Sequence, residues 1–555
     1  MDQFKRLPTI LLSALASFFT LGFFQNFHPS LGAFIILTIV LNVIFTLAFD
    51  VILAHAAVAV RNGLKEKLVS MAVLGLGIAW VILTFRLLAQ YPKLFSSEFF
   101  LPDPQLLPAF FGLTLPSQIG TAFLIHKLEA TDWRASPFLL WTKRSLPGLL
   151  LASAIFVSTY ALATALVESE PNFADNYFDT DSPFWLNFLT ASPDRMMPMR
   201  AVHPIALLIL RPPVWLISLL LNGDKFHAAL LLNSFVGGVC VFLAWTFFKG
   251  RTGNTTYALL IASLFGFSNS HLLLSVFLES YIFSAAALIT FVVLLQTRDK
   301  GLAPFIPAGL LTFGITITNF IQTCIAFLLV RRNIKDLVKY VFIVLALAVL
   351  LSFTQHILYP TSEPFYILSN LTGESVYRYD LLEVSPRTAI SRANVIFRNM
   401  ALFSEAAPRP FILLEEIGCT FPCFNTIRSF RGAYLYASYV GFGSWLARTW
   451  FVLLVIAGGI FAWKLFKSPR ETSLQAALAL NILFNFVLHM NYGDDPMLYS
   501  PNWTYALILF FGMSFEKLAD KRWFQVSLLV LLASVMFNNM ELFRKVLEAV
   551  LPFQV

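Results

Sequence analysis

Apolar runs of about 20 residues recur along almost the whole chain, and this feature limits the possible folds more than any other. A helix of that length crosses the hydrocarbon core of a bilayer. The runs are apolar on all sides and do not alternate with a period of two, which excludes a β-barrel. Only 13% of the residues are charged, against about 25% in a typical soluble domain. The sequence therefore predicts an all-α polytopic membrane protein.

Basic residues predict how these runs are oriented. Lys5 and Arg6 precede the first run, and short loops rich in lysine or arginine face the cytoplasm. The first run is followed at once by a second, which predicts a span and not a cleaved signal peptide. We expect roughly 15 transmembrane helices, with a cytoplasmic amino terminus and a carboxyl terminus outside. The expected spans are 7–26, 31–54, 68–90, 106–126, 146–167, 228–248, 255–273, 276–296, two short helices in 303–330, 338–358, 446–466, 472–490, 501–515 and 523–541.

Residues 184–222 interrupt this alternation. If this stretch and the next run both crossed the membrane, the later basic loops would fall outside. Arg211 is followed by Pro212 and Pro213, and proline removes a backbone donor while arginine is costly in lipid. We therefore expect interfacial or re-entrant helices here. Within 303–330 the basic ends require an even number of crossings, so two short helices should meet near Thr316–Asn319.

These positions divide the chain into four regions, two of which contain substantial loops on the outer side. They are an N-terminal four-helix transmembrane region, 1–145; a transmembrane core, 146–358, with a first outer loop at 168–222; an outer loop or lid, 359–443; and a C-terminal transmembrane region, 444–555.

The formal net charge of +8 does not indicate nucleic-acid binding, because the basic residues lie in short loops between spans. Cys240 and Cys324 fall in apolar runs and are expected to be buried. Cys419 and Cys423 lie together in the lid, where a local disulfide remains open. A zinc site is not expected there without further cysteine or histidine ligands.

The first outer loop carries the strongest chemical signal. Asp175, Asp179 and Asp181 are interleaved with aromatic residues that include Tyr177. Carboxylates close together near a low-dielectric boundary suit a group that accepts a proton, and aromatic rings suit the apolar face of a sugar. A solvated acidic loop is the alternative. The pair Asp179 and Asp181 is also compatible with binding of a divalent cation, although two carboxylates alone are weak evidence for a metal site.

Arginines follow these acids along the same loop. Arg200 and Arg211 lie at the expected interface, where guanidinium groups match the oxygens of a lipid phosphate. The alternative is that they only anchor interfacial helices by extending their charged ends to water. His203, before a proline, either caps a helix or contacts substrate.

Further polar groups occur where later spans meet the outer side. Glu279 is an isolated acid in SVFLESYIF, and an acid there faces a cavity or positions a helix rather than contacting lipid. His489, Tyr492 and Tyr499 lie at the outer end of another span and are candidates to close a site opposite the first loop. Tyrosine is also an ordinary anchor at membrane interfaces.

The lid contains arginine but no lysine, and it also contains acids that match the arginines in number. Preference for arginine fits bidentate recognition of phosphate, whereas a lid that satisfies its own charges is the alternative. A long loop of this kind is more often a functional cap than a linker. The arginines are Arg378, Arg387, Arg392, Arg398, Arg409, Arg428 and Arg431.

The layout of 146–541 resembles the GT-C superfamily, the polytopic glycosyltransferases that use polyprenyl-phosphate sugars, with the layout of protein mannosyltransferases and aminoarabinose transferases. The matching pieces are the DNYFDTD acids, the interfacial HPIALLILRPPVW, a span ending in KGR and the outer turn GFSNSHLLLSVFLES. The resemblance implies that an acid of the first outer loop acts as base or positions the acceptor. The candidates are Asp179 or Asp181, then Asp175.

The expected function is therefore a membrane glycosyltransferase of the hexosyl or pentosyl class. It would take a polyprenyl-phosphate sugar from the bilayer and transfer the sugar to a glycan, lipid or protein acceptor on the outer face, in a bacterial inner membrane. The expected substrate-binding residues are Tyr177, Arg200, His203, Arg211, Glu279, His489, Tyr492 and Tyr499. The alternatives are a membrane transporter, a lipid flippase and a non-catalytic protein of the same architecture.

Overall fold

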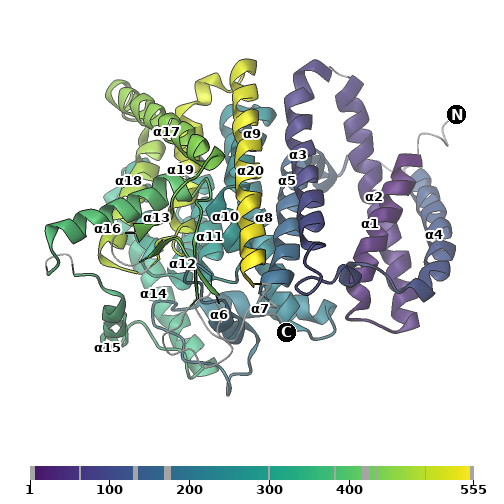
Figure 1. The fold of residues 1–555 in the computed structure, drawn as a ribbon, viewed down its shortest axis with the longest axis horizontal. Coiled ribbons are helices and arrows are strands. Elements are labelled where there is room, and N and C mark those ends of the chain that lie inside the picture. Colours follow the sequence, from purple (N-terminus) through teal and green to yellow (C-terminus); the bar gives the residue numbers. More distant parts are fainter. Residues whose placement is uncertain are drawn as a thin grey trace.

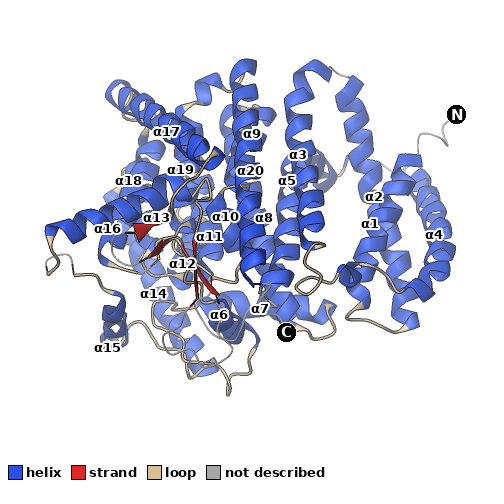
Figure 2. Cartoon of the chain, in the orientation of Figure 1, coloured by secondary structure: helices blue, strands red, loops and turns tan. Residues whose placement is uncertain are grey.

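Helices account for most of the computed structural model, and the few strands lie together in one small region (Figure 2). The structure describes residues 7–61, 64–128, 135–167, 177–297, 301–380, 383–414, 425–431, 435–493 and 495–550. The expectation of a third loop acid concerns Asp175, and that of a local disulfide concerns Cys419 and Cys423. All three residues lie outside the described ranges.

Ten of the described helices are long and apolar enough to cross a membrane. Large apolar side chains are exposed along them, as expected for surfaces that face lipid. The chain is therefore an integral membrane protein of all-α type. The long helices are α1 (Leu7–Gln25), α2 (Leu31–Arg61), α3 (Leu64–Leu88), α4 (Leu107–Leu128), α5 (Pro137–Leu166), α8 (Lys225–Thr252), α14 (Ile334–Leu358), α17 (Phe442–Lys467), α18 (Ser473–Asn491) and α20 (Arg522–Val550).

The remaining expected spans are shorter helices. One is a pair bent by 60°, and counting it as one span gives up to 11 crossings. A helix of 16 residues, the length of α11, is about 24 Å long and falls short of the roughly 30 Å hydrocarbon core. Helix length thus supports ten or 11 of the roughly 15 expected crossings. The shorter helices are α9 (Thr255–Gly266) and α10 (Asn269–Val276), which form the bent pair, α11 (Ser280–Leu295), α12 (Phe305–Ile315), α13 (Asn319–Arg331) and α19 (Pro501–Ser514).

Helices α1, α2 and α4 form a layer at one side of the molecule, whereas α3 packs against α5, α9 and α20 (Figure 1). The side layer has its own small apolar cluster and a buried polar contact set. Gln118 of α4 donates to Ser13 of α1 at 3.0 Å and to Asn42 of α2 at 3.3 Å. Such hydrogen bonds hold helices together where lipid offers no hydrophobic drive.

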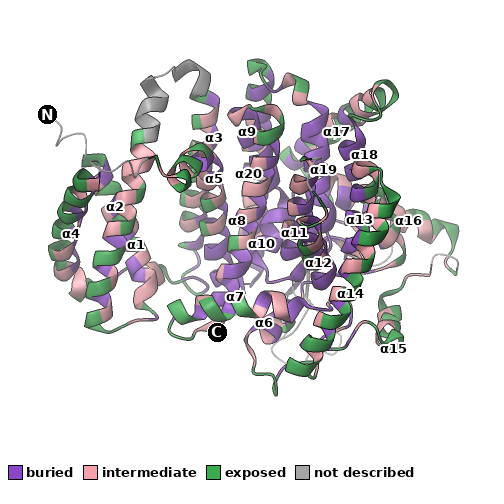
Figure 3. Ribbon diagram, turned by 180° about the vertical axis from the view of Figure 1, so that it is seen from behind, coloured by how far each residue is buried: buried purple, intermediate pink, exposed green. Residues whose placement is uncertain are grey.

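The main core lies around α8, which contacts α5, α7 (Ala206–Leu220), α9, α10 and α11. Buried residues are concentrated in these helices, while exposed residues dominate the outer ones (Figure 3). Gly237 of α8 allows α10 to approach closely, because an added Cβ would lie 2.3 Å from Ser275 Oγ of α10. The short helices are therefore held in the interior of the bundle.

Two short helices lie across the ends of the long ones, at the end of the molecule where α20 finishes (Figure 1). They occupy the stretch for which interfacial or re-entrant helices were expected. The two prolines expected to disturb a crossing are both inside the second helix. These helices are α6 (Ser182–Thr190) and α7 (Ala206–Leu220).

The outer loops satisfy backbone groups where helices break inside the bundle. Between α12 and α13, Ile317 N donates to Val202 O at 3.2 Å, and Gly314 O accepts from Ile205 N at 3.1 Å. The break falls at the expected Thr316–Asn319. Because unpaired backbone groups are costly in an apolar interior, these bonds stabilise the break between the two helices.

The break between α9 and α10 is closed in the same way by the lid. Asn269 N donates to Glu405 O at 3.0 Å, and Ser270 N donates to Ser404 O at 3.0 Å. Asn539 of α20 also donates to Glu405 O, at 2.9 Å. The first amides of α10 are thus capped by lid carbonyls and not by its own side chains.

The lid follows α14 and consists of short elements. A π-helical turn, Asn399–Phe403, leads into the capping residues. Strands β1 and β2 are antiparallel, with Phe411 opposite Arg428. The remaining elements are α15 (Leu368–Thr372), α16 (Pro386–Arg398), β1 (Phe411–Leu414), β2 (Asn425–Arg428), β3 (Phe430–Arg431) and β4 (Leu435–Tyr436), the last two also antiparallel.

Candidate active site

The first outer loop and the lid meet through Asp179. Its carboxylate forms an ion pair with the Arg428 guanidinium at the end of β2. One residue earlier, Phe178 N donates to Ile427 O at 2.6 Å. The other Asp179 oxygen accepts from Asp495 N at 3.2 Å. An acid of the first loop, an arginine of the lid and the loop before α19 therefore share one place.

Backbone strain is present at this contact. Phe178 and Asp179 have φ values of 54° and 66°, the left-handed region. This conformation costs a residue with a side chain roughly 1–2 kcal/mol. The neighbouring rings hold it in place, since Phe178 is buried and Tyr177 stacks on Phe277 with centroids 4.7 Å apart. Strain maintained by surrounding contacts is a reason to look for function at Asp179.

Asp495 is fully buried and holds the lid strand from the other side. Its carboxylate accepts from Ser429 N at 2.9 Å, from Ser429 Oγ at 2.5 Å and from Met497 N at 2.9 Å. Burial raises the pKa of Asp495, although these hydrogen bonds oppose that shift. Because Ser429 follows Arg428 directly, Asp495 fixes the position of the arginine that pairs with Asp179.

Asp181 stands at the start of α6 and is linked to Glu279. The Asp181 backbone N–H donates to the Glu279 carboxylate, and the second Glu279 oxygen accepts from Ser280 N at 3.2 Å. Glu279 is buried and is the N-cap of α11. The acid expected to line a cavity or position a helix thus caps α11 and fixes the backbone beside the candidate base.

A second charged group surrounds Arg200. Its guanidinium donates to both Glu374 oxygens, at 2.8 and 2.5 Å, and to Tyr492 Oη at 2.9 Å. Tyr492 Oη donates in turn to Glu374 at 2.6 Å. The Tyr377 ring lies 4.5 Å from the guanidinium carbon. Arg200 is therefore positioned by the Glu374 carboxylate, the Tyr492 hydroxyl group and the Tyr377 ring rather than left as a free surface anchor.

Tyrosine rings join the two groups. Tyr281, in the first turn of α11, lies against Tyr499 with centroids 5.3 Å apart, and Tyr499 is 6.1 Å from Tyr492. Glu279 caps the helix that carries Tyr281. Ring contacts thus connect the Arg200 group to α11, whose N-cap residue Glu279 accepts the hydrogen bond from the Asp181 backbone.

Arg211 does not join these groups. Its guanidinium donates to Ala191 O and to Met196 Sδ, and lies 4.8 Å from the Tyr359 ring. It therefore fixes the end of α6 against α7. Burial, which disfavours the charged form, lowers its pKa.

His203 and His489 are packed as structural residues. His203 Nδ1 lies 2.6 Å from Ile315 O, and its ring is 5.0 Å from Trp185. Burial lowers the pKa of His203 to about 4, with a smaller contribution from the Arg200 charge. His489 is covered by the Tyr499 ring at 4.5 Å. Neither histidine contacts the Asp179 carboxylate through a described hydrogen bond.

Three residues of the site were not expected from the sequence by themselves. Glu374 and Tyr377 belong to the lid, where the arginines were the candidates named, and Tyr281 lies two residues after Glu279, the candidate named in that segment. The equal numbers of acids and arginines in the lid were the available signal. Arg200 shows that such pairing also extends from the lid to the first outer loop.

The described residues contain no group of three or more histidine, cysteine, aspartate or glutamate side chains placed to hold a metal ion. Among the described residues, Asp179 and Asp181 therefore have no third histidine, cysteine or carboxylate side chain placed to complete a cation site with them. Comparison with protein-family models, characterised proteins and solved structures finds no match. The function is accordingly inferred from the geometry of the site.

Proposed function

We propose that this protein is a membrane glycosyltransferase with the GT-C architecture. It transfers a sugar from a polyprenyl-phosphate donor to an acceptor on the non-cytoplasmic side of the membrane. The observation that supports this most directly is the contact between Asp179 and Arg428, which places an acid of the first outer loop beside a lid cation. Asp181 follows two residues later, at the start of α6.

The pair has the two parts that such a reaction needs. Arg428 binds the donor phosphate, because a guanidinium fork matches phosphate oxygens. When the phosphate takes this cation, the Asp179 carboxylate becomes available to the acceptor. Asp179 or Asp181 then removes the hydroxyl proton, the acceptor oxygen attacks the anomeric carbon, and the bond from that carbon to the phosphate oxygen breaks. The electron pair leaves on the phosphate, where Arg428 stabilises the added charge.

The Arg200 group supports recognition of the sugar. Tyr377, Tyr492 and Tyr499 present rings and hydroxyl groups close to one another. Aromatic rings pack against the apolar face of a sugar. The tyrosine hydroxyl groups donate hydrogen bonds to the sugar hydroxyl groups or accept them, and the Glu374 carboxylate accepts them. The long apolar helices provide the bilayer from which a lipid-linked donor enters.

Substitution of the two acids tests this function. Asn tolerates the left-handed backbone of Asp179, so Asp179→Asn removes the charge and retains the loop conformation. Purified protein in lipid nanodiscs is given a panel of polyprenyl-phosphate hexoses and pentoses, and release of polyprenyl phosphate is measured. We expect Asp179→Asn and Asp181→Asn to lower turnover singly, and the double variant to lack transfer. General-base removal typically costs about 10²–10⁴-fold.

Asp194→Asn is the matched control, because Asp194 lies in the same loop and its side chain is 76% exposed. It should transfer at the unaltered rate. Full transfer by the Asp179 and Asp181 double variant would refute the proposed mechanism. Absence of transfer from every donor in the panel by the unaltered protein would refute the proposed donor class.

A transporter is the second candidate, and a different observation favours it. Helices broken within the bundle, such as α9–α10 and α12–α13, are typical of ion and solute sites in transporters. Here, however, the first amides of α10 are already bound by Ser404 and Glu405 carbonyls. Translocation of a fluorescent lipid or of a polyprenyl-phosphate sugar across proteoliposomes, without sugar transfer, would favour transport over catalysis.

A further inference from the structure

A cavity of about 280 Å³ lies between α20, the start of α17 and the lid residues that follow Glu405. Two hydrogen bonds fix its wall. Asn538 Nδ2 donates to Ala407 O at 2.9 Å, and Ala407 N donates to Asn539 Oδ1 at 2.8 Å. The groove therefore has a defined shape, set by α20 and by the segment that caps α10.

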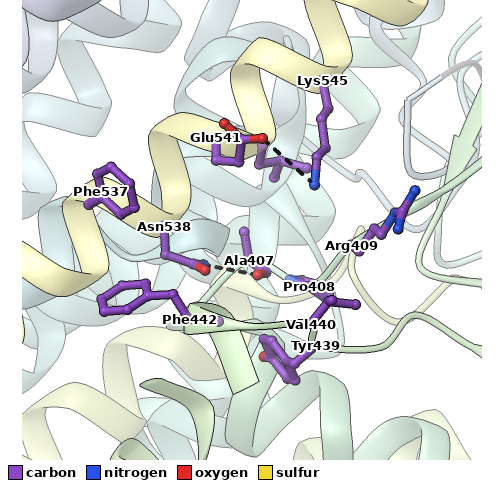
Figure 4. Close-up of a pocket in the computed structure, with 12 residues that line it drawn as sticks. Ala407, Pro408, Arg409, Tyr439, Val440, Phe442, Phe537, Asn538, Glu541 and Lys545 are labelled. Atoms are coloured by element: carbon purple, nitrogen blue, oxygen red, sulfur yellow. Dashed lines mark hydrogen bonds and ion pairs between the residues drawn. The ribbon is translucent and has the colours of Figure 1, made fainter. Parts of the chain in front are cut away.

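The two ends of the groove differ in chemistry (Figure 4). At one end Phe442 and Phe537 are 49% and 70% exposed. At the other end Arg409 of the lid and Lys545 of α20 both line the cavity (Figure 4). Phe537 and Lys545 are eight residues apart on one helix, which corresponds to about 12 Å. The apolar end thus lies towards the middle of α20 and the cationic end towards its terminus.

The cationic end carries an excess of positive charge. Among the described residues, Arg409 has no ion pair, and its backbone N–H donates to Ser438 O at 2.9 Å. Lys545 Nζ lies 3.9 Å from Glu541, the one acid in the groove lining. Glu541 is bound more closely by Arg544, at 2.5 Å. Glu541 is therefore shared, and both groove cations retain capacity for an anion.

We propose that this groove binds one anionic phospholipid from the leaflet on the lid side. Its phosphate lies between Arg409 and Lys545, and an acyl chain follows Phe442 and Phe537. The phosphodiester of a phospholipid carries one negative charge, which balances the two cations once the negative charge of Glu541 is counted. An extended acyl chain matches the separation between these cations and the exposed rings. The bound lipid connects α20 to the lid close to Glu405. This inference goes beyond the transferase function and does not depend on it.

Lipid exchange followed by native mass spectrometry tests the site. The full-length protein is placed in nanodiscs of phosphatidylcholine with a minor fraction of phosphatidylglycerol, and the protein carrying one phosphatidylglycerol is counted. We expect retention by the unaltered protein and about 30-fold weaker binding by the double variant Arg409→Gln and Lys545→Gln, given roughly fivefold for each basic residue. Phe537→Ser should weaken binding as well, since the chain contact is lost.

The double variant Arg195→Gln and Lys335→Gln is the matched control, because it removes two exposed cations that lie neither on α20 nor in the lining of the groove. It should retain phosphatidylglycerol, and equal melting temperatures in phosphatidylcholine alone should verify folding of every variant. Unchanged binding by the groove variant would refute the proposal, as would equal retention of phosphatidylcholine. Competition by millimolar glycerol phosphate as effective as that by the lipid would show an anion site and overturn the assignment of a phospholipid.

Discussion

Asp179 of the first outer loop and Arg428 of the lid form an ion pair across 249 residues of sequence. Their side chains are only 15% and 20% exposed. The pair joins the first outer loop to the lid, two segments that are separated in the chain by the helices from α8 to α14. It therefore contributes to closure of the lid as well as to the proposed chemistry, and both contributions lead to measurable expectations.

The first prediction concerns the energy of this pair. Removing one partner leaves the other charge largely buried, so Asp179→Asn and Arg428→Gln should each destabilise the protein by about 2–4 kcal/mol. The double variant should lose less than the sum of the two, with a coupling energy of about 1–3 kcal/mol. Thermal unfolding in one lipid composition measures all three variants.

The neighbouring Asp194 and Arg195 provide the control for that cycle. Their charged atoms are 3.9 Å apart, and their side chains are 76% and 85% exposed. A pair of this kind contributes less than about 1 kcal/mol, and its variants should add independently. Additive losses at Asp179 and Arg428 would contradict an energetically coupled contact.

The second prediction concerns Gly493, whose φ of +85° favours glycine. A Cβ there would lie 2.5 Å from the Tyr499 ring. Gly493→Ala should therefore incur about 1–2 kcal/mol for the backbone and a further 1–3 kcal/mol for displacement of the ring. Because Tyr499 contacts Tyr281 and Tyr492, turnover should fall together with the melting temperature.

Gly223 separates these two contributions. Its φ is +89°, but no atom lies within 4 Å of an added Cβ. Gly223→Ala should therefore show only the backbone cost and leave turnover unchanged. If Gly493→Ala were no more harmful than Gly223→Ala, the close packing of Tyr499 would not limit the site.

The sequence was informative where physical signals are local. Apolar runs of sufficient length predicted the helices, and Arg211-Pro212-Pro213 predicted an irregular segment, in which α6 and α7 are short. The polar Thr316–Asn319 stretch predicted the break between α12 and α13. The ends of a helix within a long apolar run are harder to predict from the sequence. Three segments that were expected to cross the membrane therefore contain helices shorter than the bilayer core, namely α9, α11 and α19.

Long-range pairing could not be predicted in the same way. The basic loops predicted that Asp179 and Arg428 lie on the same side of the membrane. They did not indicate which of the lid arginines pairs with Asp179. Similarly, nothing in the local sequence indicates that lid carbonyls cap α10, because backbone groups have no residue-specific signature. Arg211 matched the phosphate-binding pattern but binds the Ala191 carbonyl, since an interfacial arginine also suits a helix end.

The third prediction concerns the response of stability to acid through His203. Burial lowers its folded pKa to about 4, against an ordinary value of 6.5. Between these values the unfolded chain binds a proton that the folded protein does not, so stability falls as the pH decreases from 6.5 to 4 and then levels off. Each unit of difference corresponds to about 1.4 kcal/mol. His203→Gln should remove this part of the pH dependence, measured as the difference between two melting curves.

Glu405 leads to a fourth prediction with the opposite sign. Its side chain is fully buried, and neither carboxylate oxygen has a hydrogen-bond partner among the described residues. Burial therefore raises its pKa well above the ordinary value of 4.5. Above pH 4.5 the unfolded chain releases a proton that the folded protein retains, so the unaltered protein loses stability as the pH rises towards the folded pKa.

Glu405→Gln keeps the size of the side chain and cannot ionise, and the backbone carbonyl that binds Asn269 and Asn539 is unchanged. The variant should match the unaltered protein near pH 4 and exceed it in stability at pH 8, by at least about 1.4 kcal/mol for each unit of pKa shift spanned. Melting curves at both pH values measure the difference. A variant less stable than the unaltered protein at pH 8 would mean that the ionised carboxylate has a stabilising partner, and Glu405 would then belong to a functional charge pair.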